Sequence, residues 1–123
     1  MKLTKAEEQL MDIIWKCKKA FFKEILDSYP DPKPAPTTVA TLIKRIQDKG
    51  FIHYELFGNS RQYYPLVDRD DYFSKNLKEM VKDYFNDSAL QFASFFTKTS
   101  DMTADELEDL RSIVEQELNR KKK

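Results

Sequence analysis

The N-terminal part of the chain carries apolar residues at the spacing of a helix. Thr4 stands three residues before Glu7, the spacing of a capping box, so we expect a helix to begin there. Its apolar face comprises Leu10, Met11, Ile13, Ile14 and Trp15. A second helix is expected over about residues 21–29, with Phe22, Ile25, Leu26 and Tyr29 on one side.

A proline-rich connector leads into a third helix. Four prolines in residues 30–36 exclude the interior of a helix or of a central strand. Pro36 suits a first helical turn and Gly50 suits the position after the last one, which predicts a helix over 37–49. Its buried face has the i, i+3, i+4, i+7 spacing and comprises Val39, Leu42, Ile43 and Ile46. The outward positions are Thr37, Thr38, Thr41, Lys44, Arg45 and Asp48.

A β-hairpin is expected next. Residues 51–57 and 61–67 are rich in aromatic and β-branched residues, and Gly58-Asn59-Ser60 lies between them. Pro65 is expected near the end of an edge strand, where its missing N–H does no harm.

The rest of the chain has helical spacing again. One helix is expected from residues 68–71 to about 86, then a short apolar segment over 89–96 and a break over 97–101. Thr103 and Glu106 have capping-box spacing at the start of a last helix. The order predicts a mainly α fold with a small β-hairpin: a winged helix-turn-helix domain over 1–70 and a helical region over 71–123.

Composition limits the function. Apolar residues make up 41% of the 123, enough for a core, and Cys17 is the only cysteine, which excludes an internal disulfide or a cysteine-based metal site. We interpret Cys17 as a partly buried thiol in a reducing, cytoplasmic setting. The polar N-terminus and the lack of a long apolar run argue against a signal peptide and against membrane insertion.

The net charge of zero hides an uneven distribution. Residues 1–67 carry 11 Lys and Arg against 8 Asp and Glu, whereas residues 68–123 carry 10 against 13. A basic front half fits nucleic acid. Thr37, Thr38 and Thr41 can contact base edges or phosphates in a major groove, and Lys44, Arg45 and Arg61 can neutralise phosphates. The alternative is the solvated face of an ordinary amphipathic helix.

Three blocks of sequence resemble the BlaI/MecI family of penicillinase-type transcriptional repressors. They are residues 3–15 (LTKAEEQLMDIIW), residues 37–52 (TTVATLIKRI followed by KGFI) and residues 63–67 (YYPLV), and residues 105–110 (DELEDL) add to them. The resemblance covers nearly the whole chain. It implies a homodimer that binds double-stranded, dyad-symmetric operator DNA, often with TACA/TGTA half-sites, and a link to antibiotic resistance. Thr38, Thr41 and Arg45 fall on family positions that face DNA. Ala40 departs from members with a basic residue there.

The second half has a physical reason to dimerise. Seven aromatic residues are more than a small helical tail buries easily alone: Tyr72, Phe73, Tyr84, Phe85, Phe92, Phe95 and Phe96. The predicted dimerisation residues are Leu77, Met80, Val81, Tyr84, Phe85, Leu90, Phe92, Phe95, Phe96, Leu107, Leu110 and Val114. The alternative is that the aromatic side chains pack on the first domain of the same chain.

The resemblance also bears on regulation. Family members that respond to β-lactams are inactivated through a membrane-bound sensor protease, commonly by cleavage of an Asn-Phe bond in the dimerisation part. No Asn precedes Phe in the matching region, so Ser94-Phe95 or Phe95-Phe96 is the expected bond. A copper-responsive relative needs a C-terminal cysteine cluster, which residues 71–123 lack.

The sequence gives no sign of an enzyme, a cofactor or a metal site. His53 is the only histidine, with no nucleophile signalled beside it, and is interpreted as a wing residue. The alternative function is a protein–protein adaptor that keeps the winged-helix fold without binding DNA, and the zero net charge and Ala40 lean that way.

Overall fold

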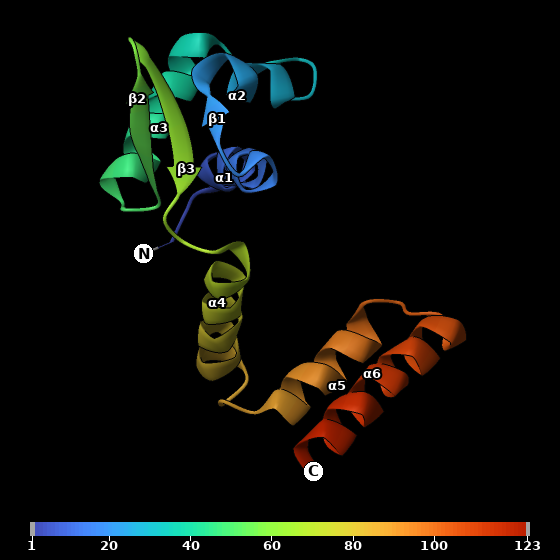
Figure 1. Ribbon diagram of the computed structural model, residues 1–123. Helices are drawn as coiled ribbons and strands as arrows, with labels where there is room; N and C mark the ends of the chain where they lie inside the picture. The colour runs from blue at the N-terminus through green and yellow to red at the C-terminus, as the bar shows by residue number, and fades with distance from the viewer. Residues whose placement is uncertain (1, 123) are drawn as a thin grey trace. The chain divides into compact units, whose positions relative to one another are not determined.

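The computed structural model describes residues 2–122. The chain divides into two compact units, Met1–Asn76 and Leu77–Lys123. In chain order the elements are α1 (Lys5–Cys17), β1 (Ala20–Phe21), α2 (Phe22–Ser28), α3 (Pro36–Asp48), β2 (Ile52–Phe57), β3 (Ser60–Pro65), α4 (Arg69–Tyr84), α5 (Ala89–Thr99) and α6 (Ala104–Lys122) (Figure 1). The mainly α fold class with a winged-helix domain is confirmed.

The first helix begins as the sequence predicts. The Thr4 hydroxyl accepts a hydrogen bond from the Glu7 N–H, and the Glu7 carboxylate accepts one from the Thr4 N–H at 2.8 Å. Both halves of the capping box are therefore present. The helix ends at Cys17, whose side chain is exposed, so the interpretation of this thiol as partly buried is wrong. The last turn of the helix carries it away from the core.

The sheet has three strands, one more than the hairpin. Ala20 and Phe21 form β1, which pairs with β3 before α2 begins, in the order β1-β3-β2. The prediction that Pro65 ends an edge strand is therefore wrong, because β3 is the central strand. Pro65 is tolerated because β1 pairs only with Gln62 and Tyr63. At Pro65 the strand has no neighbour on the β1 side, so the missing N–H leaves no hydrogen bond of that pairing unmade.

The hairpin turn is tighter than the sequence indicated. Phe57 pairs with Ser60, which leaves only Gly58 and Asn59 in the loop. Gly58 has φ +63°, and a glycine with positive φ at the first loop position is what a type II′ turn needs. The strands are correspondingly Ile52–Phe57 and Ser60–Pro65 rather than 51–57 and 61–67.

One hydrophobic core holds the first unit together. It comprises Leu3, Leu10, Met11, Ile13, Ile14, Ala20, Ile25, Tyr29, Val39, Leu42, Ile43, Ile46, Phe51, Ile52, Tyr63 and Tyr72. Tyr72, at the start of α4, is only 5% exposed. Its ring meets that of Phe51 edge-on at 5.6 Å, and its hydroxyl donates to Glu8 and accepts from the Leu3 N–H. The expectation that Tyr72 needs a second copy to be buried is wrong.

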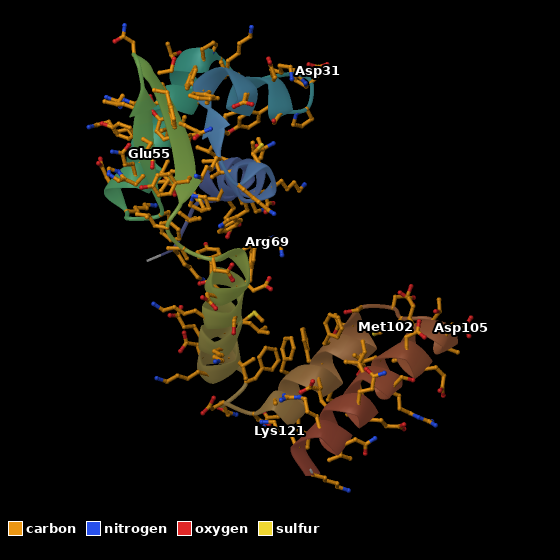
Figure 2. The ribbon with its side chains drawn as sticks, in the orientation of Figure 1. Asp31, Glu55, Arg69, Met102, Asp105 and Lys121 are labelled. Carbon is orange, nitrogen blue, oxygen red and sulfur yellow. The ribbon has the colours of Figure 1, made fainter. Side chains whose placement is uncertain are left out.

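The second unit consists of the end of α4 with α5 and α6, which runs back in the direction opposite to α5 (Figure 1). Thr103 and Glu106 form the predicted capping box at the start of α6, close to Met102 and Asp105 in Figure 2. The break expected over 97–101 is shorter, because α5 continues to Thr99. The hydroxyls of Thr97 and Thr99 donate to carbonyls of the preceding turn, so they do not interrupt the helix.

Among residues 2–122, no helix is both long enough and apolar enough to cross a membrane.

Candidate nucleic-acid interface

Helix α3 has a buried apolar face and an exposed polar one. Val39, Leu42, Ile43 and Ile46 are buried in the core, as predicted. The opposite face exposes all five predicted contact residues of the helix: Thr37, Thr38, Thr41, Lys44 and Arg45. The core thus fixes the helix from behind and leaves a row of hydroxyl and cationic side chains free to enter a groove.

The N-terminal end of α3 is open to an anion. Pro36 occupies the first helical position, and Ala35 at the N-cap offers no side-chain oxygen to the first N–H groups. The positive end of the helix dipole also lies there. Thr37 and Thr38 stand in this turn, where a phosphate can accept from hydroxyl and backbone donors together.

The hydroxyl of Thr41 is oriented by the helix itself. Its Oγ1 donates to the Thr37 carbonyl at 3.0 Å. With its proton engaged, the oxygen presents lone pairs outward and the methyl group is held beside it. Such a side chain can accept a hydrogen bond from a base amino group or touch a thymine methyl.

The wing brings a third cation to the edge of α3. Arg61 of β3 and Lys44 of α3 line the same cleft of about 310 Å³. Its lining is Phe22, Ala40, Ile43, Lys44, Gln47, Asp48, Arg61 and Tyr63. The Arg61 guanidinium lies over the Tyr54 ring, 4.4 Å from its centroid. This cation–π contact restricts the arginine to the cleft side of the hairpin.

Two carboxylates lie near these cations, but only one shares the cleft. Asp48 lines it together with Lys44 and Arg61. Glu55, labelled on β2 in Figure 2, pairs with Gln62 and therefore belongs to the sheet face opposite Arg61. The cleft carries two cations against one anion, which favours a phosphate.

Ala40 also lines this cleft. It lies on the edge of α3 that faces the wing, whereas Thr38 and Arg45 lie on the far edge, as helical geometry requires. The small alanine side chain leaves Lys44 and Arg61 as the cations on this side. Ala40 itself adds no charge to the cleft, whose cations are Lys44 and Arg61.

A salt bridge that the sequence did not reveal anchors the end of α3. Lys49, the C-cap residue, places its Nζ 2.6 Å from Oε1 of Glu7, which is only 1% exposed. Burial by itself raises the pKa of the Glu7 carboxyl, but hydrogen bonds from Lys49 and Thr4 and the Lys49 charge outweigh it and hold the pKa below its usual value. The contact spans 42 positions, so no local pattern signals it.

His53 lies apart from the exposed face of α3 in the sequence and belongs to the wing strand β2. His53 lies exposed on β2, with its ring centroid 5.2 Å from that of Tyr54. Within residues 2–122, no three His, Cys, Asp or Glu side chains gather as metal ligands would.

These elements define a class of protein. A helix pair supports a third helix with an exposed hydroxyl-and-cation face, and a hairpin adds an arginine at its edge. That is a winged-helix DNA-binding domain.

Comparisons with known proteins give the family. The family model for the penicillinase repressor matches residues 3–116. The chain is 32% identical to the methicillin resistance regulatory protein MecI of Staphylococcus aureus (strain N315), covering 91% of this chain and 92% of that protein. It is 24% identical to the penicillinase repressor of Bacillus licheniformis, covering 98% and 94%. The chain therefore belongs to the penicillinase repressor family, a family of transcriptional repressors and not of enzymes.

A solved structure agrees with this assignment. The solution structure of the DNA-binding domain of the repressor BlaI is similar to 58% of this chain and 88% of its own, with a TM-score of 0.52 and 26% identity. The family and this domain together support a transcriptional repressor rather than the protein–protein adaptor.

Proposed function

We propose that this repressor acts in the cytoplasm as a homodimer on dyad-symmetric operator DNA, with one α3 in each of two successive major grooves. One observation carries the proposal: the five predicted contact residues of α3 are exposed, while its apolar face is fixed in the core. Genes of antibiotic resistance are the proposed targets, because relatives are named for methicillin resistance and penicillinase.

Each predicted contact has a distinct role in the proposed complex. Thr37 and Thr38 bind phosphate at the helix N-terminus, Thr41 reads a base edge, and Arg45 holds the opposite strand or a guanine. Lys44 and Arg61 hold a phosphate between them at the cleft. Phosphate contacts supply most of the affinity and the threonines add sequence preference.

The proposed dimer covers a surface that one chain leaves open. None of the predicted dimerisation residues is buried in the single chain, and α5 and α6 contain no buried residue at all. Leu90 is 81% exposed and Val114 is 58% exposed. Burying a large apolar side chain contributes about 1.5–3 kcal/mol, so a twofold copy gains considerably by covering this surface.

A cluster of four phenylalanines organises that surface. Phe85 lies 5.5 Å from Phe92 and 5.4 Å from Phe95 between ring centroids, and Phe92 stacks on Phe96 at 6.0 Å. Phe95 and Phe96 nevertheless remain about half exposed. These contacts restrict the phenylalanine side chains in the single chain, so a second copy has less conformational entropy to remove when it binds.

Relief of repression by proteolysis is the proposed route of induction. Ser94, Phe95 and Phe96 all lie within α5 and are exposed. A protease acts most readily on exposed, flexible backbone rather than on a helix. Cleavage at Ser94-Phe95 or Phe95-Phe96 by a membrane-bound sensor system therefore requires α5 to unwind first.

The test is selection of bound DNA from genomic fragments with the full chain, followed by gel-shift titration of the enriched site. The proposal expects a dyad-symmetric site in promoter regions, bound by two chains. Failure to enrich any sequence, with the protein folded, would exclude operator binding. Enrichment of a site without dyad symmetry would exclude the dimeric arrangement.

A further inference from the structure

A second pocket lies on the first unit, away from the exposed face of α3. It has a volume of about 540 Å³ and sits between the end of α1 and the segment that joins β3 to α4. Its lining is Trp15, Lys16, Lys18, Pro65, Leu66, Val67, Asp68 and Arg69. No residue of α3 belongs to it, so the proposed DNA contacts do not account for it.

The floor of this pocket is apolar and fixed. The indole N–H of Trp15 donates to the Val67 carbonyl at 2.8 Å, which sets the orientation of the ring. The N–H of Leu66 donates to the Phe51 carbonyl at 2.8 Å and holds the backbone, yet the Leu66 side chain is 56% exposed. The exposed Leu66 side chain and the half-buried Trp15 ring together form an apolar surface that an apolar ligand can contact.

The rim of the pocket is cationic. Lys16, Lys18 and Arg69 line it against the single carboxylate of Asp68. Arg69, at the start of α4 in Figure 2, makes only long ion pairs, at 3.7 Å from Asp12 and from Asp70. Over residues 2–122, Lys16 and Lys18 take part in no ion pair. Lys16 and Lys18 therefore supply positive charge to the rim, whereas Arg69 is shared with Asp12, Asp70 and the Phe73 ring.

The helix dipole of α1 explains the lysines of the rim but not the rest of the pocket. Lysines at the end of α1 also complement the negative end of the helix dipole. That role requires neither the exposed Leu66 nor a concave space over Trp15. The coincidence of an apolar floor, a cationic rim and a ligand-sized volume needs a further explanation.

We propose that this pocket binds a small amphipathic anion, with an apolar or aromatic body over Trp15 and Leu66 and a carboxylate between Lys16, Lys18 and Arg69. The volume falls in the range of about 300–1,000 Å³ typical of small-molecule sites. Because the pocket lies between α1 and the first turn of α4, an occupant adds contacts between two elements that already meet through Asp12 with Arg69 and through Trp15 with Tyr72 and Phe73. The site is independent of the DNA-binding face.

The experiment titrates the full chain with 4-phenylbutyrate, which has an aromatic body and a carboxylate. Trp15 is the only tryptophan and lines this pocket, so its fluorescence can report binding there. A ligand this small binds with a Kd of about 1 mM, so ionic strength is matched with sodium chloride throughout. The neutral 4-phenylbutanamide is the matched probe without charge. The proposal expects a saturable change with the acid and binding at least about tenfold weaker with the amide.

Variants locate the site. Lys16→Glu/Lys18→Glu is expected to weaken 4-phenylbutyrate at least about tenfold, and Leu66→Ala to weaken both probes. Lys5→Glu/Lys23→Glu changes two exposed lysines elsewhere and is expected to leave the Kd unchanged. Where the double Glu variant does not fold, Lys16→Gln/Lys18→Gln replaces it. No saturable change, equal binding of acid and amide, or equal loss in the Lys5/Lys23 control would overturn the proposal. No DNA is present, so the outcome is separate from that of operator binding.

Discussion

The ammonium group of Lys49 lies 2.6 Å from the buried carboxylate of Glu7 and so joins the end of α3 to the start of α1. Glu7 also caps α1 through Thr4. The Glu7 carboxylate therefore caps the start of α1 and also binds the end of α3. The orientation of α3, on which the exposed contact face depends, rests partly on this pair.

Replacing Glu7 with Gln is expected to destabilise the first unit. The substitution keeps the shape but leaves the Lys49 ammonium group without its charged partner, so we expect the free energy of unfolding to fall by about 1–3 kcal/mol. Urea denaturation measures it. Glu79→Gln, at an exposed position of α4, is the control and should change the stability by less than about 0.5 kcal/mol. Equal stability of Glu7→Gln and the wild type would show that the pair is not structural.

The same pair predicts a dependence of stability on pH. Because the pKa of Glu7 in the folded chain lies below its usual value of 4.5, the folded state holds the ionised form more strongly than the unfolded state does. This contribution is complete above the unfolded pKa and is lost as pH falls through the lower folded pKa. Glu7→Gln should therefore lose less stability than the wild type between about pH 5 and pH 3. The measurement is urea denaturation of both proteins, followed by circular dichroism, at a series of acid pH values. An equal loss of free energy of unfolding in both proteins would contradict the prediction.

Local patterns predicted the parts of the fold that local chemistry decides. The four apolar positions of α3 and the capping boxes at Thr4 and Thr103 follow from spacing alone. The strand Ala20–Phe21 could not be predicted in this way. Two residues are too few to show an alternating hydrophobic pattern, and they form a strand only through pairing with β3.

The same limit applies to the candidate site. The exposed face of α3 could be predicted from its sequence, but the cleft shared by Lys44 and Arg61 could not. The Glu7–Lys49 pair and the burial of Tyr72 against Leu3 and Phe51 also join distant segments. Tertiary packing decides such contacts, so no sequence window contains them.

Arg45→Ala is expected to weaken operator binding without unfolding the protein. The side chain is exposed and takes part in no ion pair among residues 2–122, so its loss leaves the core intact. We expect about tenfold weaker binding by gel-shift titration. Arg111→Ala, on the exposed surface of α6, is the matched control. Unchanged binding by Arg45→Ala would remove this residue from the interface.

Ala40→Lys is expected to strengthen DNA binding. The substitution adds a cation to the cleft that Lys44 and Arg61 already line. One further phosphate contact per protomer should steepen the slope of log K against log salt by about 1 for each protomer. Fluorescence anisotropy over a salt series measures the slope, and an unchanged slope would place this cleft outside the DNA interface.

Val114→Glu is expected to shift the dimer towards monomer. Val114 is 58% exposed in the single chain, and a carboxylate buried there without a partner should weaken association at least about tenfold. Ser112→Glu, on the opposite side of α6, is the control. Sedimentation equilibrium over a concentration series distinguishes them. Equal association of both variants and the wild type would show that this face of α6 is not the interface.

The central claim is that α3 and the wing bind operator DNA chiefly through phosphates, with one helix of a dimer in each half-site. The most direct measurement is anisotropy titration of the full chain on its selected operator and on a version with one half-site scrambled, across a series of salt concentrations. We predict a steep fall in affinity with salt and a loss of at least about tenfold on the scrambled site. A flat salt response, or equal binding to both DNA molecules, would contradict this account.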